Sequence, residues 1–64
     1  MTTLLQQAAS AHQAGHLDEA DRLYARLLAA EPHNAQALHW RAIACHQMGR
    51  HDEALRLIGR ALAV

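Results

Sequence analysis

Apolar residues recur every three or four positions in four segments of this chain. That spacing places them on one side of an α-helix, and no segment alternates with the period of two that a half-buried strand requires. The pattern therefore predicts four helices and an all-α fold. The four apolar faces are Leu4, Ala8 and Ala11; Ala20, Leu23, Tyr24, Leu27 and Leu28; Leu38, Ala42 and Cys45; and Ala54, Leu57, Ile58, Ala61 and Leu62.

Capping signals predict where these helices begin and end. Thr3 followed by Gln6 has the spacing of a capping box, so a first helix is expected from about residue 3 to about residue 14, just before Gly15. Because the predicted connections are short, neighbouring helices should be antiparallel. The other expected N-terminal caps are Asp18 for a helix to about Ala30, Asn34 for a helix over 35–48, and Asp52 for a helix to the chain end.

The second half of the chain repeats the first with an offset of 34 residues. Residues 15–20 (Gly-His-Leu-Asp-Glu-Ala) match residues 49–54 (Gly-Arg-His-Asp-Glu-Ala), and thirteen of thirty aligned pairs are identical. A fixed period of this length is typical of stacked helical hairpins. We therefore expect a single domain over residues 1–64, with repeat one at about 1–34 and repeat two at about 35–64.

The 34-residue unit, the Gly-x-x-Asp-Glu-Ala turns, the small residues at matched positions, Tyr24, and Pro32 at the end of the first unit resemble the tetratricopeptide repeat. The resemblance covers the whole chain. It implies two helix-turn-helix hairpins in a short right-handed solenoid that acts as a non-catalytic scaffold for protein–protein interaction. The chain departs from the family pattern at Leu4 and Leu38, where the family often has tryptophan.

The same resemblance implies a concave groove lined by the first helix of each hairpin. Some family members hold a C-terminal carboxylate there with Lys, Arg and Asn, none of which this chain has at those positions, so a peptide with apolar side chains fits better. By helical phase Trp40 points about 160° away from Leu38, either as an anchor for a partner or as a ring lying over neighbouring side chains. The expected partner-binding residues are Leu5, Ala9, His12, Gln13, Gln36, His39, Trp40, Ile43, His46 and Gln47.

The two ends of the predicted stack differ in polarity. The outer side of the first helix carries Thr3, Gln7 and Ser10, which suits exposure to water. The last helix has an apolar stripe about 180° wide with only one predicted neighbour, and exposed patches of that kind usually mark an interface. We expect homo-oligomers rather than a frayed end. The expected self-association residues are Leu55, Ile58, Leu62 and Val64.

Charge and hydropathy argue against several other classes of partner. Six arginines balance six acidic residues, so neither nucleic acid nor an anionic membrane is an expected partner. No apolar run approaches the roughly 20 residues of a membrane span, and no signal peptide is visible. A single cysteine fits a reducing compartment. These features predict a cytoplasmic protein.

No catalytic residue, cofactor or metal ion is predicted. Cys45 falls on an apolar face, where burial raises a thiol pKa, and the adjacent His46 points about 100° away from it. The pairs His12 with His16 and His39 with His46 supply too few ligands for a zinc site. The repeated carboxylates at helix starts are accounted for by the helix dipole, and neither a phosphate-binding Gly loop nor a nucleophile elbow is present.

The repeats are also similar to arrays at the N-termini of larger bacterial proteins, some of which have glycosyltransferase-like or sulfotransferase-like catalytic parts. The alternative to a stand-alone interaction module is therefore an N-terminal oligomerisation or substrate-targeting fragment of such an enzyme. The native reading frame after Val64 would distinguish the two.

Overall fold

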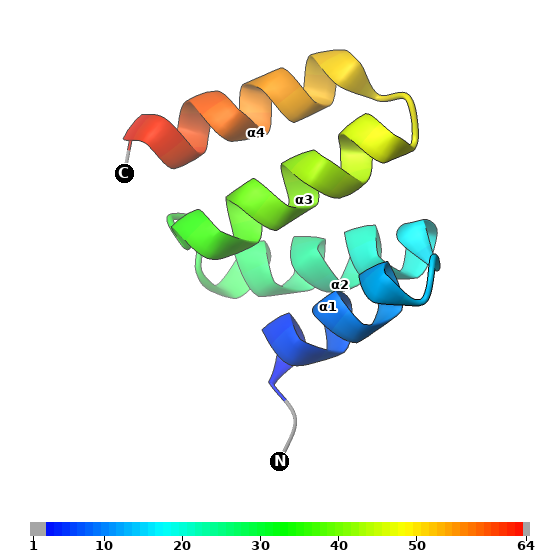
Figure 1. Ribbon diagram of the computed structural model, residues 1–64. Helices are drawn as coiled ribbons and strands as arrows, with labels where there is room; N and C mark the ends of the chain where they lie inside the picture. Colours follow the sequence, from blue (N-terminus) through cyan, green and yellow to red (C-terminus); the bar gives the residue numbers. More distant parts are fainter. Residues whose placement is uncertain (1–2, 64) are drawn as a thin grey trace.

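The computed structural model describes residues 3–63, in which four helices follow one another without a strand. Helices α1 (Leu4–Gln13) and α2 (Leu17–Ala30) form one hairpin, and α3 (Ala35–Gln47) and α4 (His51–Ala63) form a second (Figure 1). Helix α2 packs against α1 and α3, whereas α4 runs beside α3 alone in the described part of the chain. The predicted all-α architecture of helical hairpins is confirmed.

Two of the four predicted helix caps are confirmed by their hydrogen bonds. The Gln6 backbone N–H donates to the Thr3 hydroxyl at 3.1 Å, and the Thr3 backbone N–H donates to the Gln6 side-chain oxygen at 3.0 Å. The Ala37 backbone N–H donates to the Asn34 side chain at 3.1 Å. These side chains satisfy backbone donors that the first helical turn leaves unpaired, so α1 and α3 begin where the sequence predicts.

The other two predicted caps are wrong. Helix α2 begins at Leu17, after an N-cap at His16 that makes no side-chain capping bond, and α4 begins at His51. Asp18 and Asp52 therefore lie inside the first turns of their helices. In that place a carboxylate still stabilises the positive end of the helix dipole, which explains why the repeat carries an acid there.

Glycines at the ends of α1 and α3 explain why α2 and α4 begin before Asp18 and Asp52. Gly15 and Gly49 have φ of 85° and 83°, in the left-handed region that favours glycine. The amide of the next residue then donates to the carbonyl five residues back, from His16 to Ala11 at 2.9 Å and from Arg50 to Cys45 at 2.8 Å. This closure leaves three residues between the helices of each hairpin.

The core is built around small residues that let the helices approach closely. Tyr24 of α2 is fully buried among alanines from α1, α2 and α3. In α4, Ala54 and Leu57 are buried, but Ile58 and Leu62 remain exposed because no helix within residues 3–63 lies over them. The larger buried cluster comprises Leu27, Leu28, Ala37, Leu38, Ala42, Cys45, Ala54 and Leu57.

A charged cluster joins three of the four helices. Arg41 Nε of α3 donates to Asp21 Oδ1 of α2 at 2.8 Å, and Arg41 Nη2 lies 3.6 Å from Glu53 Oε1 of α4. Arg50 Nη1 lies 3.6 Å from Asp21 Oδ2. Although burial lowers the pKa of Arg41, the hydrogen bond and charge of Asp21 raise it by more, so this side chain stays cationic between the helices.

Candidate partner-binding surfaces

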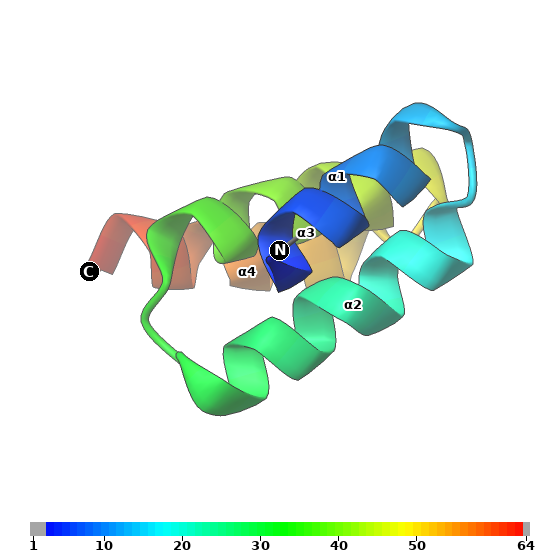
Figure 2. The ribbon, with the colours of Figure 1, turned by 90° about the horizontal axis from the view of Figure 1, so that it is seen from below.

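The expected groove is divided into two hollows by α3. The first hollow lies between α1 and α3, has a volume of about 330 Å³, and is lined by Leu5, Gln6, Ala9, His12, Gln13, Tyr24 and Trp40. The second hollow lies between α3 and α4, has a volume of about 500 Å³, and is lined by Ala42, Ile43, His46, His51, Ala54, Leu55 and Ile58. Figure 2, seen from below, shows α1 and α2 side by side, with α3 and α4 behind them.

The ten expected groove residues fall into three groups. Leu5, Ala9, His12, Gln13 and Trp40 line the first hollow. Ile43 and His46 line the second hollow, and Gln47 reaches the edge of the first hollow through a bond to His12. Gln36 and His39 are exposed and line neither hollow.

Trp40 forms one wall of the first hollow. Its side chain is 44% exposed, and its ring meets the imidazoles of His12 and His39 edge to face, with centroid separations of 6.3 and 5.5 Å. The indole is therefore held by neighbours while almost half of it stays available. Exposed tryptophans held in this way are frequent energetic centres of protein interfaces.

His12 links α1 to the two helices beside it. Its Nε2 lies 2.6 Å from Gln47 Oε1 of α3, and its Nδ1 lies 3.4 Å from the Tyr24 hydroxyl of α2. Because Gln47 Oε1 can only accept, His12 Nε2–H donates to it, and His12 Nδ1 faces the Tyr24 hydroxyl. Burial raises the pKa of Tyr24. These two bonds hold the floor and the edge of the first hollow in place.

The second hollow is apolar with two histidines at one end. Leu55 and Ile58 of α4 are 68% and 42% exposed. His46 Nδ1 and His51 Nδ1 lie 2.9 Å apart, so one imidazole donates and the other accepts. Sequence reasoning missed His51, although it precedes Leu55 by four residues and Ile58 by seven, a spacing that places all three on one side of a helix.

The expected self-association residues that the structure describes lie together on α4. Leu62 is 82% exposed and continues the side formed by Leu55 and Ile58. Val64 lies outside the described residues. Figure 1 shows α4 at the edge of the molecule, with α3 on one side of it only. A long apolar side of this helix is therefore open to a partner.

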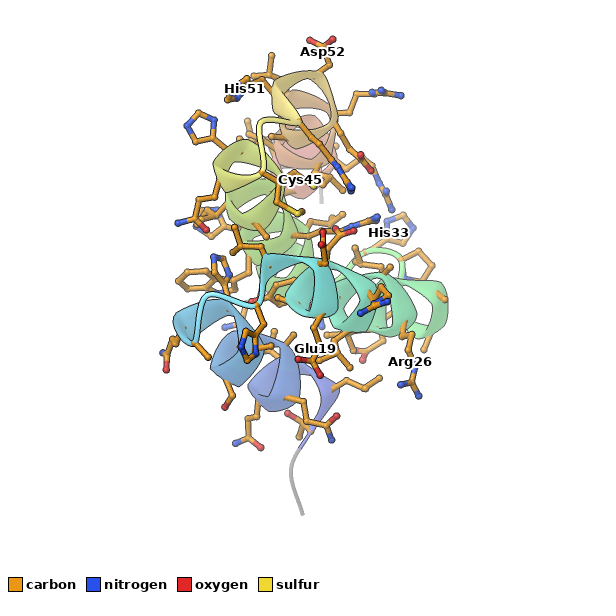
Figure 3. The ribbon with its side chains drawn as sticks, turned by 90° about the vertical axis from the view of Figure 1, so that its right-hand side faces the viewer. Glu19, Arg26, His33, Cys45, His51 and Asp52 are labelled. Atoms are coloured by element: carbon orange, nitrogen blue, oxygen red, sulfur yellow. The ribbon has the colours of Figure 1, made fainter. Side chains whose placement is uncertain are left out.

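The one cysteine lies in the core and away from both hollows. Figure 3 shows Cys45 pointing from α3 toward α2, where its Sγ is 3.7 Å from Asp21 Oδ1. Burial, and then the negative charges of Asp21 and Glu53, raise the pKa of Cys45. A thiol kept neutral in this way is a poor nucleophile.

The described part of the chain contains neither a cluster of metal ligands nor a helix suited to crossing a membrane. Within residues 3–63, no three His, Cys, Asp or Glu side chains converge on a point that could hold a metal ion. The same residues include no helix with both the length and the apolar character to cross a membrane. The two hollows offer apolar surface bordered by glutamine and histidine side chains.

Comparison with known proteins agrees with the fold of helical hairpins. A family model described as the tetratricopeptide repeat matches residues 11–64, which is most of the chain. No curated protein and no solved structure matches it. The chain therefore belongs to the tetratricopeptide repeat family, whose repeats generally mediate protein–protein interaction.

Proposed function

We propose that this protein is a non-catalytic interaction module that holds an apolar side chain of a partner peptide in the first hollow. The observation that carries the proposal is the combination of an apolar hollow of about 330 Å³ with a half-exposed Trp40 as its wall. Hollows of this size are typical of sites that enclose a small group. Tryptophan adds a large contact area at low entropic cost.

The edge of the first hollow defines the chemistry of the partner. The side-chain amides of Gln6 and Gln13 border this hollow, and its lining contains no arginine. A peptide carboxylate would find no arginine there, whereas the amides of an internal segment would find the glutamine amides as hydrogen-bond partners. The partner is therefore an internal peptide segment with a leucine or an aromatic anchor.

The first hollow is held ready for binding by bonds from two helices. His12 of α1 contacts Tyr24 of α2 at 3.4 Å and Gln47 of α3 at 2.6 Å. Because these contacts fix α1 relative to α3, a partner does not have to order the walls of the site when it binds. Preorganisation of this kind lowers the entropic cost of association.

Selection from a random library of 12-residue peptides tests this proposal, with binding measured through the fluorescence of Trp40, the one tryptophan of the chain. Peptides with an internal leucine or aromatic residue should be enriched. Ala9→Glu, which adds a charge inside the first hollow, should weaken binding at least tenfold. Ser10→Glu adds the same charge at the next residue, outside the first hollow, and should not weaken binding.

Two outcomes would count against the first hollow as the binding site. One is a selection dominated by peptides that require a free terminal carboxylate. The other is an equal loss of binding in Ala9→Glu and Ser10→Glu when circular dichroism shows that both variants are folded.

We also propose that the chain self-associates through the open side of α4, formed by Leu55, Ile58 and Leu62. The exposure of three large apolar side chains on one helix supports this, because contiguous patches of this kind are uncommon on monomers. Assembly would give the module more than one first hollow per particle, which increases its apparent affinity for a partner with several binding segments. Sedimentation at several concentrations tests for assembly.

A further inference from the structure

The second hollow is the repeat-two counterpart of a surface that α3 covers in part in repeat one. An offset of 34 residues maps its lining residues Ala42, Ala54, Leu55 and Ile58 onto Ala8, Ala20, Asp21 and Tyr24. In repeat one α3 covers the part of this surface formed by Ala8, Ala20 and Tyr24, which are fully buried. Ala9 and His12, the counterparts of Ile43 and His46, stay open in the first hollow. In repeat two nothing in the described chain covers it, and Ile58, the counterpart of Tyr24, is 42% exposed. The equivalent face of repeat two therefore has room for one more helix.

One residue that differs between the repeats, Asp21 in repeat one and Leu55 in repeat two, indicates what kind of helix could cover the second hollow. Asp21 Oδ1 accepts a hydrogen bond at 2.8 Å from Nε of Arg41, which belongs to the covering helix α3. The counterpart of Asp21 in repeat two is Leu55, which is 68% exposed and has no group that could pair with a cation. A second helix of the α3 type would bury its arginine against leucine, at a high desolvation cost. The face that remains open in repeat two therefore fits an apolar helix surface.

Helix α4 itself carries such an apolar surface. His51, Leu55, Ile58 and Leu62 are separated by four, three and four residues, which is the spacing along the seam of two packed helices. Gly59 borders this seam, and a Cβ built at Gly59 would meet nothing within 4 Å. A glycine in mid-helix destabilises a lone helix, but it lets a second backbone approach closely.

We infer that a second copy of this chain covers the second hollow by packing its α4 antiparallel against this α4. A twofold axis between residues 56 and 57 sets Leu55 of each chain against the partner's Ile58. The same axis sets Leu62 of each chain against the partner's His51, at the end of the second hollow. Both pairs are centred on the same point, so every exposed seam residue meets a seam residue of the other copy. This inference rests on the self-association proposed above and adds its geometry.

The charges of α4 favour the antiparallel direction. The first turn of α4 contains Asp52 and Glu53, and its last turn contains Arg60. In Figure 3 Asp52 projects from the beginning of α4 away from α3. An antiparallel pair places this acidic end beside the basic end of the other helix, and it also opposes the two helix dipoles. A parallel pair would bring acidic end to acidic end, which like-charge repulsion disfavours.

The polarity of α1 argues against the alternative in which copies stack head to tail. In that arrangement α1 of one copy would cover the second hollow of the next, as α3 covers repeat one. The α3 residues Ala37 and Ala44 are fully buried in that role. Their counterparts in α1 are Thr3, which caps the helix, and Ser10, both exposed and polar. Burying them against an apolar face would cost hydrogen bonds to water.

Sedimentation of matched variants tests whether the open side of α4 is the contact. Wild type should sediment as two chains, and Leu62→Glu should weaken the association at least tenfold. Ala63→Glu adds the same charge at the next exposed residue, off the seam, and should sediment like wild type. Leu62 is 82% exposed, so Leu62→Glu should stay helical by circular dichroism. Equal behaviour of the two variants would overturn the inference.

Electron paramagnetic resonance tests the direction. A spin label is placed at Ala63→Cys in a Cys45→Ala background, in which alanine matches Ala11 of repeat one. In the antiparallel pair the two labelled residues are offset by thirteen residues, so their Cα atoms should lie more than about 20 Å apart. A parallel pair would bring them to about 10 Å.

The outcomes separate this inference from the proposals on which it rests. A label separation near that of a parallel pair overturns the antiparallel geometry but leaves self-association intact. If Ser10→Arg dissociates the assembly and Leu62→Glu does not, the contact between α4 helices is wrong and the copies stack head to tail. A single-chain mass at every concentration overturns both this inference and self-association, while peptide binding in the first hollow would still stand.

Discussion

Replacing Asp21 and Arg41 with alanine, singly and together, measures how much the charged cluster stabilises the packing of the two hairpins. The Arg41 Nε–Asp21 Oδ1 bond at 2.8 Å joins α2 to α3. The two side chains are only 20% and 13% exposed, so water and salt screen them less than an ordinary surface pair. A measurable contribution to stability is therefore expected.

The expected size follows from the geometry of the cluster. A hydrogen bond to a charged group contributes about 1.5–3 kcal/mol. In Asp21→Ala, Arg41 and Arg50 lose their shared anion and only Glu53, 3.6 Å from Arg41, remains. Each single variant should therefore lose about 2 kcal/mol, and the pair should show a coupling energy of about 1 kcal/mol. A domain of this length has roughly 3–10 kcal/mol of stability, so the loss is a large fraction.

Urea unfolding followed by circular dichroism gives these free energies in the Leu62→Glu background, where the self-association we propose does not contribute. Arg26→Ala is the control for loss of an arginine, because Arg26 is exposed on α2 (Figure 3). It should change stability by less than about 0.5 kcal/mol. If the Asp21→Ala and Arg41→Ala costs simply add, with no coupling, the cluster does not join the hairpins in the way the contacts indicate.

Three further predictions follow from single residues, each measured by urea unfolding in the same background. Gly15→Ala should destabilise the fold by about 1 kcal/mol, because φ of 85° strains any residue with a Cβ. Gly59→Ala should stabilise it by about 0.5–1 kcal/mol, because the added Cβ meets nothing within 4 Å and helix propensity improves. Opposite signs would refute either prediction. The free energy of unfolding should fall as the pH rises above about 9, because burial raises the pKa of the Cys45 thiol above its ordinary value of 9.0. The unfolded chain then loses this proton first and is stabilised. Cys45→Ala should flatten that slope between pH 8 and 10, and an unchanged slope would show that Cys45 is not its source.

Much of the fold could be predicted because its signals are local. Apolar spacing identified all four helices, and the side chains of Thr3 and Asn34 act as caps as predicted. The predicted caps Asp18 and Asp52 were wrong because the sequence pattern does not distinguish an acidic residue at the N-cap from one in the first helical turn. The closing bonds around Gly15 and Gly49, rather than the acidic side chains, decide where the next helix begins.

The partner-binding surfaces were predictable only in part. The family resemblance implied a groove containing Leu5 and Ala9, and helical phase turned Trp40 away from the core; the structure brings all three together in the first hollow. Neither the resemblance nor helical phase predicted that Ile43 would be separated from them, because that depends on how α3 lies between its neighbours. Tyr24, which belongs to α2, also reaches the first hollow, and no pattern within α2 indicates this.

The sequence by itself determined the four helices, the two-hairpin repeat and the apolar side of the last helix, because each depends on residues close together in the chain. The tertiary structure alone decided that Arg41 meets Asp21 and Glu53, and that His46 pairs with His51. It also decided that two hollows form on either side of α3. These features depend on the distances between helices, which are set by the sizes of all the side chains packed between them.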